Sequence, residues 1–261
     1  MKSPLRYPGG KTRAIKILEK YVTQFYPDTN TLVSPFFGGG SFELYMKTKY
    51  RYKIIANDLF EPLYTFWNAL SKSKQIIDSV RAKIPVTKDT FQHMRRTIFE
   101  ETDPIKRAAM YFCINRCSFS GSTFCGGFSN EASQKRLTES SIKKLEACDV
   151  SDVEFHNKDC CEFLKEHPPV KNTLVFADPP YYIESYIYGK DGDLHMKFDH
   201  EKFAREIQKR NDWIITYNDC PYVRNLYNGC IIFEESWSYG MNTSKQSSEI
   251  VILPNPAATF V

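Results

Sequence analysis

The sequence predicts an α/β fold in which an open sheet is interrupted by an inserted, mostly helical segment. The first observation is an alternation of short apolar runs, ending in glycine or acidic residues, with amphipathic helical patterns over residues 1–80 and again over 151–261. The second is the loss of that alternation over residues 81–150. With 261 residues and 42% apolar content, the chain is long enough for one sizeable core and an inserted subdomain.

The composition argues against a membrane protein and against a metal site. The sequence has no run of about eighteen apolar residues, and its start, Met1–Arg6, passes into a polar glycine turn without a signal-peptide pattern. We therefore expect a cytoplasmic protein without membrane contact. The eight cysteines lack C-x-x-C spacing and the five histidines are scattered, so we expect reduced thiols and no metal.

The first motif is the Pro-Gly-Gly turn within Leu5–Lys11, which precedes a helical pattern with Ile15, Leu18 and Val22 on one face. The glycines let the backbone approach a ligand closely. Lys11 falls at the helix start, where the helix dipole disfavours a cation unless an anion lies nearby. We interpret Lys11 as functional; the alternative is an exposed lysine after a tight turn.

A glycine-rich loop follows a short predicted strand that begins at Thr31. The loop, Ser34–Ser41, contains three consecutive glycines and leads into a helix from Ser41 to Lys49. These glycines permit positive φ and close contact between the backbone and a bound nucleoside. The loop matches neither G-x-x-x-x-G-K-[ST] nor G-x-G-x-x-G, which favours a cofactor without phosphate, such as S-adenosylmethionine.

Acidic residues follow two further predicted strands. Lys53–Ala56 ends at Asn57-Asp58, where nucleotide-binding folds hold ribose hydroxyls; the alternative for Asp58 is a helix cap. A strand from Val153 ends at Asp159, where a short helix, Cys160–His167, begins. A helix N-cap is a good local account of Asp159.

Residues 81–150 form a basic segment. They carry twelve Lys and Arg against eight Asp and Glu, and the difference of +4 equals the net charge of the whole chain. This segment is the natural place for phosphate contacts, although a solvated charged face is the alternative for any single residue. The stretches Asn115–Gly121 and Phe124–Ser129 predict a polar, glycine-rich loop with exposed aromatic residues, which suits insertion into a base stack.

The predicted strand Thr173–Ala177 ends at Asp178-Pro179-Pro180-Tyr181, and the two prolines hold the chain extended. The Asp178 carboxylate and the Pro179 carbonyl then project from the carboxyl end of the strand, where open sheets bind ligands. Two such acceptors suit an exocyclic amine of a nucleobase, because they stabilise the positive charge that develops during alkylation. Tyr181 would stack on the base, which must be flipped out of a duplex. The alternative is a strand-ending turn.

The last part of the chain continues the α/β pattern. We interpret Asn218 and Asp219, at the end of one predicted strand, as a turn; the alternative is that they line the pocket. The predicted elements are a cover over the pocket at residues 182–198, a helix Asp199–Arg210, strands Trp213–Asp219, Cys230–Phe233 and Glu249–Leu253, and a loop Trp237–Asn242 that contacts the flipped base or DNA.

At matching positions, and over essentially its full length, the chain resembles the Dam-like, D12 class, DNA adenine N6-methyltransferases. Asp as the first residue of Asp-Pro-Pro-Tyr favours adenine, whereas Ser favours cytosine N4 and Asn a glutamine amide. The resemblance implies a Rossmann-like class I methyltransferase sheet, built from residues 1–80 and 151–261, that binds S-adenosylmethionine and performs catalysis. It also implies that residues 81–150 are an inserted target-recognition subdomain that binds double-stranded DNA.

The resemblance further implies direct transfer of the cofactor's methyl group to a flipped adenine, without a metal or an obligatory protein partner. The implied catalytic residues are Asp178, Pro179, Pro180 and Tyr181. Asp58 is implied to hold the ribose and Asp159 the adenine of the cofactor, within a cofactor-binding set of Tyr7, Lys11, Pro35, Phe36, Gly38, Gly39, Gly40, Ser41, Asp58, Asp159 and Asp178. The expected DNA-binding residues are Arg95, Arg96, Asn115, Arg116, Ser118, Phe119, Ser120, Lys135 and Arg136.

One position departs from the family pattern. An acid commonly precedes the Pro-Phe of the cofactor loop and faces the methionine ammonium, but this chain has Ser34 there. Either another acceptor takes the ammonium, such as Asp178 or backbone carbonyls, or cofactor affinity is weakened. The departure leaves open a catalytically silent DNA-binding protein on the same fold. Methylation of cytosine N4 and methylation of adenine in RNA are two further candidate activities.

Overall fold

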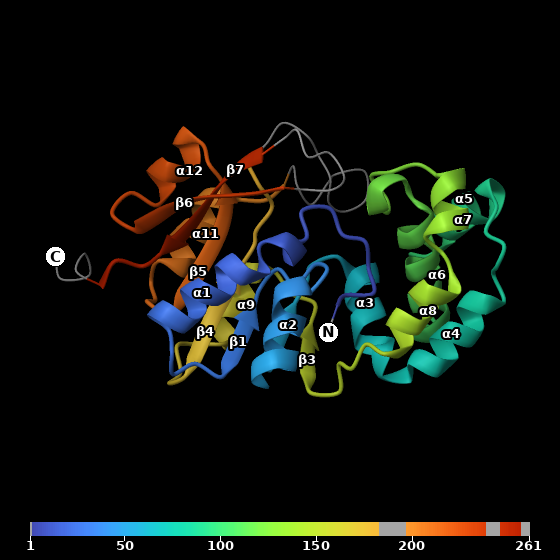
Figure 1. Cartoon of the computed structure of the whole chain (residues 1–261), viewed down its shortest axis with the longest axis horizontal. Helices are drawn as coiled ribbons and strands as arrows, with labels where there is room; N and C mark the ends of the chain where they lie inside the picture. The colour runs from blue at the N-terminus through green and yellow to red at the C-terminus, as the bar shows by residue number, and fades with distance from the viewer. Residues whose placement is uncertain (1, 183–196, 239–245, 257–261) are drawn as a thin grey trace.

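The computed structural model describes residues 2–182, 197–238 and 246–256. It consists of a seven-stranded sheet with helices on both faces, and of a helical cluster beside the sheet (Figure 1). The cluster runs from α4 (Ser73–Arg81) to α8 (Glu139–Glu146) and lies at one end of the molecule (Figure 1). No helix within the described ranges is long and apolar enough to span a bilayer.

The strand order is β3-β2-β1-β4-β5-β7-β6, and the first five strands of this order are parallel, whereas β7 is antiparallel to both of its neighbours. Because the chain order reverses between β1 and β4, the carboxyl ends of these two strands form the switch point of the sheet. The strands are β1 (Thr31–Ser34), β2 (Lys53–Asn57), β3 (Val153–His156), β4 (Thr173–Ala177), β5 (Trp213–Asn218), β6 (Ile231–Ser238) and β7 (Gln246–Leu253).

The central strands are buried on both faces because helices cover each side. Successive side chains of a strand point to opposite faces, so Leu174 and Phe176 of β4 enter one core while Val175 and Ala177 enter the other. The first core is covered by η1 (Lys11–Arg13), α1 (Ile15–Phe25), α2 (Ser41–Tyr50), α3 (Glu61–Ala69) and η2 (Leu70–Lys72). The second is covered by α9 (Cys160–Glu166), α11 (His200–Ile207) and α12 (Pro221–Leu226).

The helical cluster is organised around α6 (Pro104–Cys117), most of whose residues are buried. Asp103 begins this helix by accepting the backbone N–H of Ile105 at 2.8 Å. Helix α6 packs against both α3 and α4, and its buried residues belong to the same core as the first face of the sheet. The other elements of the cluster are α5 (Lys88–Thr97), η3 (Phe119–Gly121) and α7 (Asn130–Lys135).

The predicted strands and helices are present, with differences at their ends. Strand β6 continues to Ser238 instead of ending at Phe233, because Glu234 and Ser236 point to solvent while Trp237 is buried, so the alternation persists. The first two residues of the predicted loop Trp237–Asn242 are therefore in a strand, and the others lie outside the described residues. Most of the predicted cover at 182–198 also lies outside them.

Candidate active site

A cavity of about 380 Å³ lies at the switch point of the sheet. Its walls come from the loop after β1, the ends of β2 and β4, and two residues of the helical cluster, Tyr111 and Thr123. The cavity therefore lies between the sheet and the helical cluster. Of the predicted catalytic residues, Asp178 and Pro180 line it. The whole predicted cofactor-binding set lines it: Tyr7, Lys11, Pro35, Phe36, Gly38, Gly39, Gly40, Ser41, Asp58, Asp159 and Asp178.

Asp178 follows β4 directly, and each of its carboxylate oxygens has a hydrogen-bond donor. The Thr216 hydroxyl of β5 donates to Oδ1 at 2.7 Å, and Lys11 Nζ donates to Oδ2 at 2.6 Å. The Asp178 side chain keeps 22% exposure, whereas that of Lys11 keeps 4%. The carboxylate is thus fixed in position and remains open to the cavity.

Lys11 begins η1, and its ammonium contacts groups from two turns. It donates to Gly9 O at 3.0 Å in addition to Asp178, and it lies 5.0 Å from the centre of the Tyr181 ring. The anion that a lysine at a helix start requires is therefore the Asp178 carboxylate. This ion pair joins the Pro-Gly-Gly turn to the Asp-Pro-Pro-Tyr turn.

The glycine-rich loop after β1 packs against Tyr7. A Cβ atom at Gly38 would lie 2.8 Å from Tyr7 Cε1, and one at Gly39 would lie 2.7 Å from Tyr7 Cβ. Gly40 has φ of +60°, and a Cβ there would lie 2.5 Å from the ring of Phe37. Glycine is thus required for both the backbone conformation and the close packing of this loop.

Asp58 accepts the backbone N–H groups of Gly38 at 2.9 Å and Phe60 at 3.0 Å. It connects the end of β2 to the glycine-rich loop. The N-cap of α3 is Phe60, so Asp58 is not the helix cap that its alternative interpretation required. Burial raises the pKa of Asp58 to about 6, although the two N–H groups oppose the increase.

Asp159 is the N-cap of α9, where it accepts the backbone N–H groups of Cys161 at 3.0 Å and Glu162 at 3.3 Å. It also lines the cavity and lies 3.4 Å from Lys202 Nζ. Asp159 therefore caps α9 and also forms part of the cavity wall, so the helix cap does not conflict with the predicted contact to the cofactor.

Thr216 and Glu43 were not among the predicted site residues. Thr216 was missed because nothing in an apolar strand marks the one hydroxyl that reaches a neighbouring strand end. Glu43 is 3% exposed, lines the cavity and accepts a hydrogen bond from the Ser34 hydroxyl at 2.7 Å. Its position in the first turn of the helix after the glycine-rich loop was the available signal, because that turn faces the switch point.

Four of the expected DNA-binding residues bond to backbone groups within the chain, and a fifth, Lys135, pairs with Glu131 at 3.1 Å on the surface. Arg95 donates to the carbonyls of Phe124 and Gly126. Asn115 pairs with the backbone of Arg6 through both ends of its amide, at 2.9 and 2.6 Å. Hydrogen bonds to backbone groups also engage Arg116 and Ser118.

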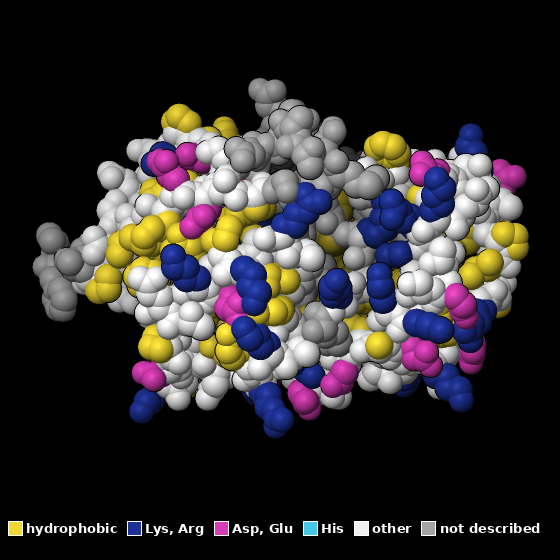
Figure 2. Space-filling view, in the orientation of Figure 1, with side chains coloured by type: hydrophobic (Ala, Val, Ile, Leu, Met, Phe, Trp, Pro, Cys, Tyr) yellow, Lys and Arg dark blue, Asp and Glu magenta, His cyan; other side chains and the backbone are white. Residues whose placement is uncertain are grey.

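The other expected DNA-binding residues lie on the surface: Arg96, Phe119, Ser120, Lys135 and Arg136. Phe119 is 68% exposed, which is unusual for a large apolar side chain. On the face of the molecule that Figure 2 shows, Lys and Arg side chains gather over the middle, between the sheet and the helical cluster.

Arg6, Arg116 and Arg136 form a cationic group. Burial, together with the charges of Arg6 and Arg136, lowers the pKa of Arg116 to about 10. Burial and the charge of Arg136 likewise lower the pKa of Arg6. Because these three positive charges repel one another, an anion bound beside them would be stabilised.

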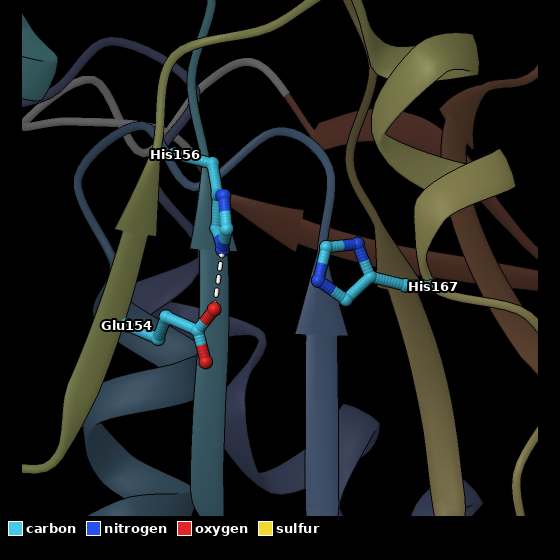
Figure 3. Close-up of side chains that lie close together, drawn as sticks. All are labelled: Glu154, His156 and His167. Atoms are coloured by element: carbon cyan, nitrogen blue, oxygen red, sulfur yellow. Dashed lines mark hydrogen bonds and ion pairs between the residues drawn. The ribbon is translucent and has the colours of Figure 1, made fainter.

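Three potential metal ligands lie together outside the cavity: Glu154 and His156 of β3 and His167 after α9 (Figure 3). Their ligand atoms are within 4.8 Å of one another. A hydrogen bond of 2.8 Å joins Glu154 Oε1 to His156 Nε2, and His167 Nδ1 bonds to Phe163 O at 2.8 Å. Because both imidazoles have partners in the chain, we assign these contacts to the packing of β3 against α9. The absence of a metal stays a prediction.

A sheet of this order, with a glycine-rich loop after β1 and Asp-Pro-Pro-Tyr after β4, defines a class I methyltransferase that acts on an amino nitrogen. The chain belongs to the D12 class N6 adenine-specific DNA methyltransferase family, whose sequence model matches residues 7–241. The predicted family, fold class and enzymatic activity, DNA adenine methylation, are therefore confirmed. Cytosine-N4 methylation, RNA methylation and silent DNA binding gain no support from this match.

Two relatives are similar over most of their length. The type II methyltransferase M.CviBI of Paramecium bursaria Chlorella virus NC1A is 22% identical over 268 residues, which cover 96% of each protein. The DNA adenine methylase of Haemophilus influenzae is 24% identical over 249 residues, which cover 86% of this chain and 82% of that protein.

Proposed function

We propose that this chain transfers a methyl group from S-adenosylmethionine to N6 of an adenine flipped out of double-stranded DNA. In this proposal the switch-point cavity holds the cofactor, and Asp178-Pro179-Pro180-Tyr181 holds the adenine. Residues 81–150 bind the DNA around the target. When bound, the cofactor supplies an electrophilic methyl group on its sulfonium sulfur.

The cavity has the size and chemistry that such a cofactor needs. Its volume of about 380 Å³ is within the range of roughly 300–1,000 Å³ of ligand pockets. Tyr7 and the glycines form a closely packed wall for the nucleoside. Asp58 supplies a carboxylate for the ribose hydroxyls and Asp159 lies at the end of β3 for the adenine ring, so the chain offers acceptors without a phosphate loop.

The observation that carries the proposal is the geometry of Asp178. Thr216 and Lys11 fix its carboxylate at the carboxyl end of β4, on the wall of the cavity. A carboxylate held in this way is preorganised to accept an N–H of the adenine amine, and the Pro179 carbonyl is the acceptor for the other. Tyr181 stacks on the base. Lys11 neutralises the charge of the Asp178 carboxylate before the base binds.

The DNA interface is best supported by charge and exposure. We assign phosphate contacts to the exposed Arg96, Lys135 and Arg136, the last of which lies beside the cationic pair of Arg6 and Arg116. We assign Phe119, with Ser120, to the gap left in the base stack. The buried contacts of Arg95, Asn115, Arg116 and Ser118 hold the loop that presents them.

Tritium transfer from labelled S-adenosylmethionine to duplex DNA tests the proposal. The variant Asp178→Ala is expected to lose about 100- to 1,000-fold in turnover, the scale of one preorganised electrostatic group, while it still binds S-adenosylhomocysteine measurably. Asp28→Ala, which changes an exposed acid after α1, is the control and should keep wild-type turnover. Near-normal transfer by Asp178→Ala would reject the assignment.

Nucleoside analysis of the labelled product tests the target atom. The label is expected in N6-methyladenine, because the first residue of the tetrapeptide is an aspartate. Recovery of N4-methylcytosine, or labelling of RNA in preference to DNA, would contradict the proposed substrate.

A further inference from the structure

Glu43 is a carboxylic acid in the wall of the cofactor cavity. It is the third residue of α2, directly after the glycine-rich loop, and is 3% exposed. A carboxylate is rarely buried without a charged partner, because loss of its hydration is costly. The proposed transfer to adenine makes no use of it.

The surroundings of Glu43 hold it in place without neutralising it. The Ser34 hydroxyl, at the end of β1, donates to Oε1 at 2.7 Å, and Ser34 is itself fully buried. Lys11 of η1 lies close enough for its charge to act on Glu43, but its ammonium is paired with Asp178 at 2.6 Å. Asp178, at the end of β4, adds a like charge.

These surroundings set the ionisation of Glu43. Burial raises its pKa to about 7; the charge of Asp178 also raises the pKa, while the Ser34 hydroxyl and the Lys11 ammonium lower it. The acid thus lacks a cation sufficient to keep it ionised. A ligand that brings a cation to this wall would supply it.

We propose that Glu43 binds the ammonium group of the cofactor's methionine moiety, and that Ser34 is the positioning residue that aims its carboxylate. The proposal rests on the proposed function, because it places S-adenosylmethionine in the cavity. The ammonium is the group that fits, since it donates hydrogen bonds and the sulfonium cannot. The acid is supplied by α2, and the hydroxyl of Ser34 touches it from the position where the family pattern has an acid.

One consequence is a coupling between cofactor binding and proton release. Because Glu43 is partly protonated near pH 7 and the ammonium requires the ionised form, binding releases a proton and strengthens as the pH rises from 6 to 8. Asp178, Lys11 and Ser34 face Glu43 from the neighbouring elements, and Asp178 and Lys11 are paired with each other.

Binding titrations of the full chain test the proposal with two ligands. S-adenosylhomocysteine carries the ammonium, whereas 5′-methylthioadenosine lacks the amino acid portion. Glu43→Gln is expected to weaken S-adenosylhomocysteine binding by about 30-fold or more and to change 5′-methylthioadenosine binding by less than about 3-fold. Glu139→Gln, which changes an exposed acid of α8, is the control and should leave both affinities unchanged.

The outcomes separate this proposal from the proposed function. If Glu43→Gln binds S-adenosylhomocysteine as the wild type does, or loses both ligands equally, the role of Glu43 is wrong while cofactor use stands. If the wild type binds neither ligand, the proposed function itself fails. An affinity of the wild type for S-adenosylhomocysteine that is independent of pH between 6 and 8 also contradicts the assignment.

A relocation experiment gives a gain of function. The double variant Ser34→Asp/Glu43→Gln places the acid at the end of β1 and removes it from α2. We expect the double variant to bind S-adenosylhomocysteine at least about tenfold more tightly than Glu43→Gln does. A double variant that binds 5′-methylthioadenosine normally but recovers nothing counts against an ammonium site at this wall.

Discussion

At the scale of single residues, the site depends on contacts between groups that are distant in sequence. Asp178 and Lys11 were each predicted to be functional, but their ion pair was not, since 167 positions separate them. Glu43 was missed altogether, because a glutamate between Phe42 and Leu44 resembles an ordinary polar position of a helix. Its burial follows from the short approach of α2 to the strand end, and the local sign of that approach is the position of Glu43 in the first turn after the glycine-rich loop.

The buried acid Glu43 gives a prediction about stability without cofactor. Its pKa is raised from 4.5 to about 7 in the folded chain, so the folded state binds more protons than the unfolded state between these values. The stability associated with this group is complete below about pH 4.5 and is lost as the pH rises through 7. Glu43→Gln is therefore expected to be more stable than the wild type by about 1–3 kcal/mol at pH 8.

Urea unfolding at pH 5 and pH 8 measures this difference. The gap between Glu43→Gln and the wild type should be small at pH 5 and should widen towards pH 8, because the amide keeps the hydrogen bond to Ser34 but cannot ionise. A variant that is less stable than the wild type at pH 8 would show that the carboxylate is already compensated.

At the scale of elements, the strands and turns were the most predictable parts. A run such as Leu174–Ala177 is apolar throughout because both faces of its strand are covered, and the residues after it cannot continue a ladder. The contacts of the residues expected to bind DNA were less predictable. Arg95 and Arg116 look like phosphate ligands in the sequence, but each donates to backbone carbonyls, and a carbonyl partner leaves no trace in the sequence.

The glycine-rich loop predicts a strong effect of one methyl group. Gly40→Ala is expected to destabilise the chain by about 2–4 kcal/mol, from the left-handed backbone and the contact with Phe37. Gly127→Ala, where nothing lies within 4 Å, should change the unfolding free energy by less than about 1 kcal/mol. Chemical denaturation of both variants measures the difference, and equal stabilities would contradict the packing described for this loop.

The exposed ring of Phe119 gives a prediction about DNA alone. Phe119→Ala is expected to weaken binding of a cognate duplex by about 5- to 100-fold, the range that one stacked base supplies, with no loss of thermal stability. Phe25→Ala, at an exposed site of α1, is the matched control. Fluorescence anisotropy with labelled duplex measures both; an unchanged affinity in Phe119→Ala would remove the ring from the interface.

At the scale of the whole molecule, the cavity lies between a basic region and an acidic one. The helical cluster carries the surplus of basic residues, and the cavity opens between that cluster and the acidic ends of the strands. A polyanion is thus attracted to one side of the cavity, and an amine to the other. This distribution was predictable from the sequence as a total for residues 81–150, but not residue by residue.

The salt dependence of DNA binding should separate surface cations from structural ones. Arg96→Ala and Lys135→Ala are each expected to reduce the slope of log affinity against log salt by about 1, because each releases one counterion. Lys165→Ala on α9 should leave the slope unchanged. Arg95→Ala should instead lower thermal stability, since it removes the hydrogen bonds to the carbonyls of Phe124 and Gly126. Equal slopes in all variants would place the DNA elsewhere.

The continuous packing of α6 on α3 has a practical consequence for engineering new sequence specificity. The helical cluster, which we propose binds the DNA, cannot simply be exchanged at residues 81 and 150, because a donor cluster would bring side chains shaped for a different partner surface. A chimera is expected to fold only when α3 and α4 travel with it, so the useful junctions lie upstream, near the end of β2.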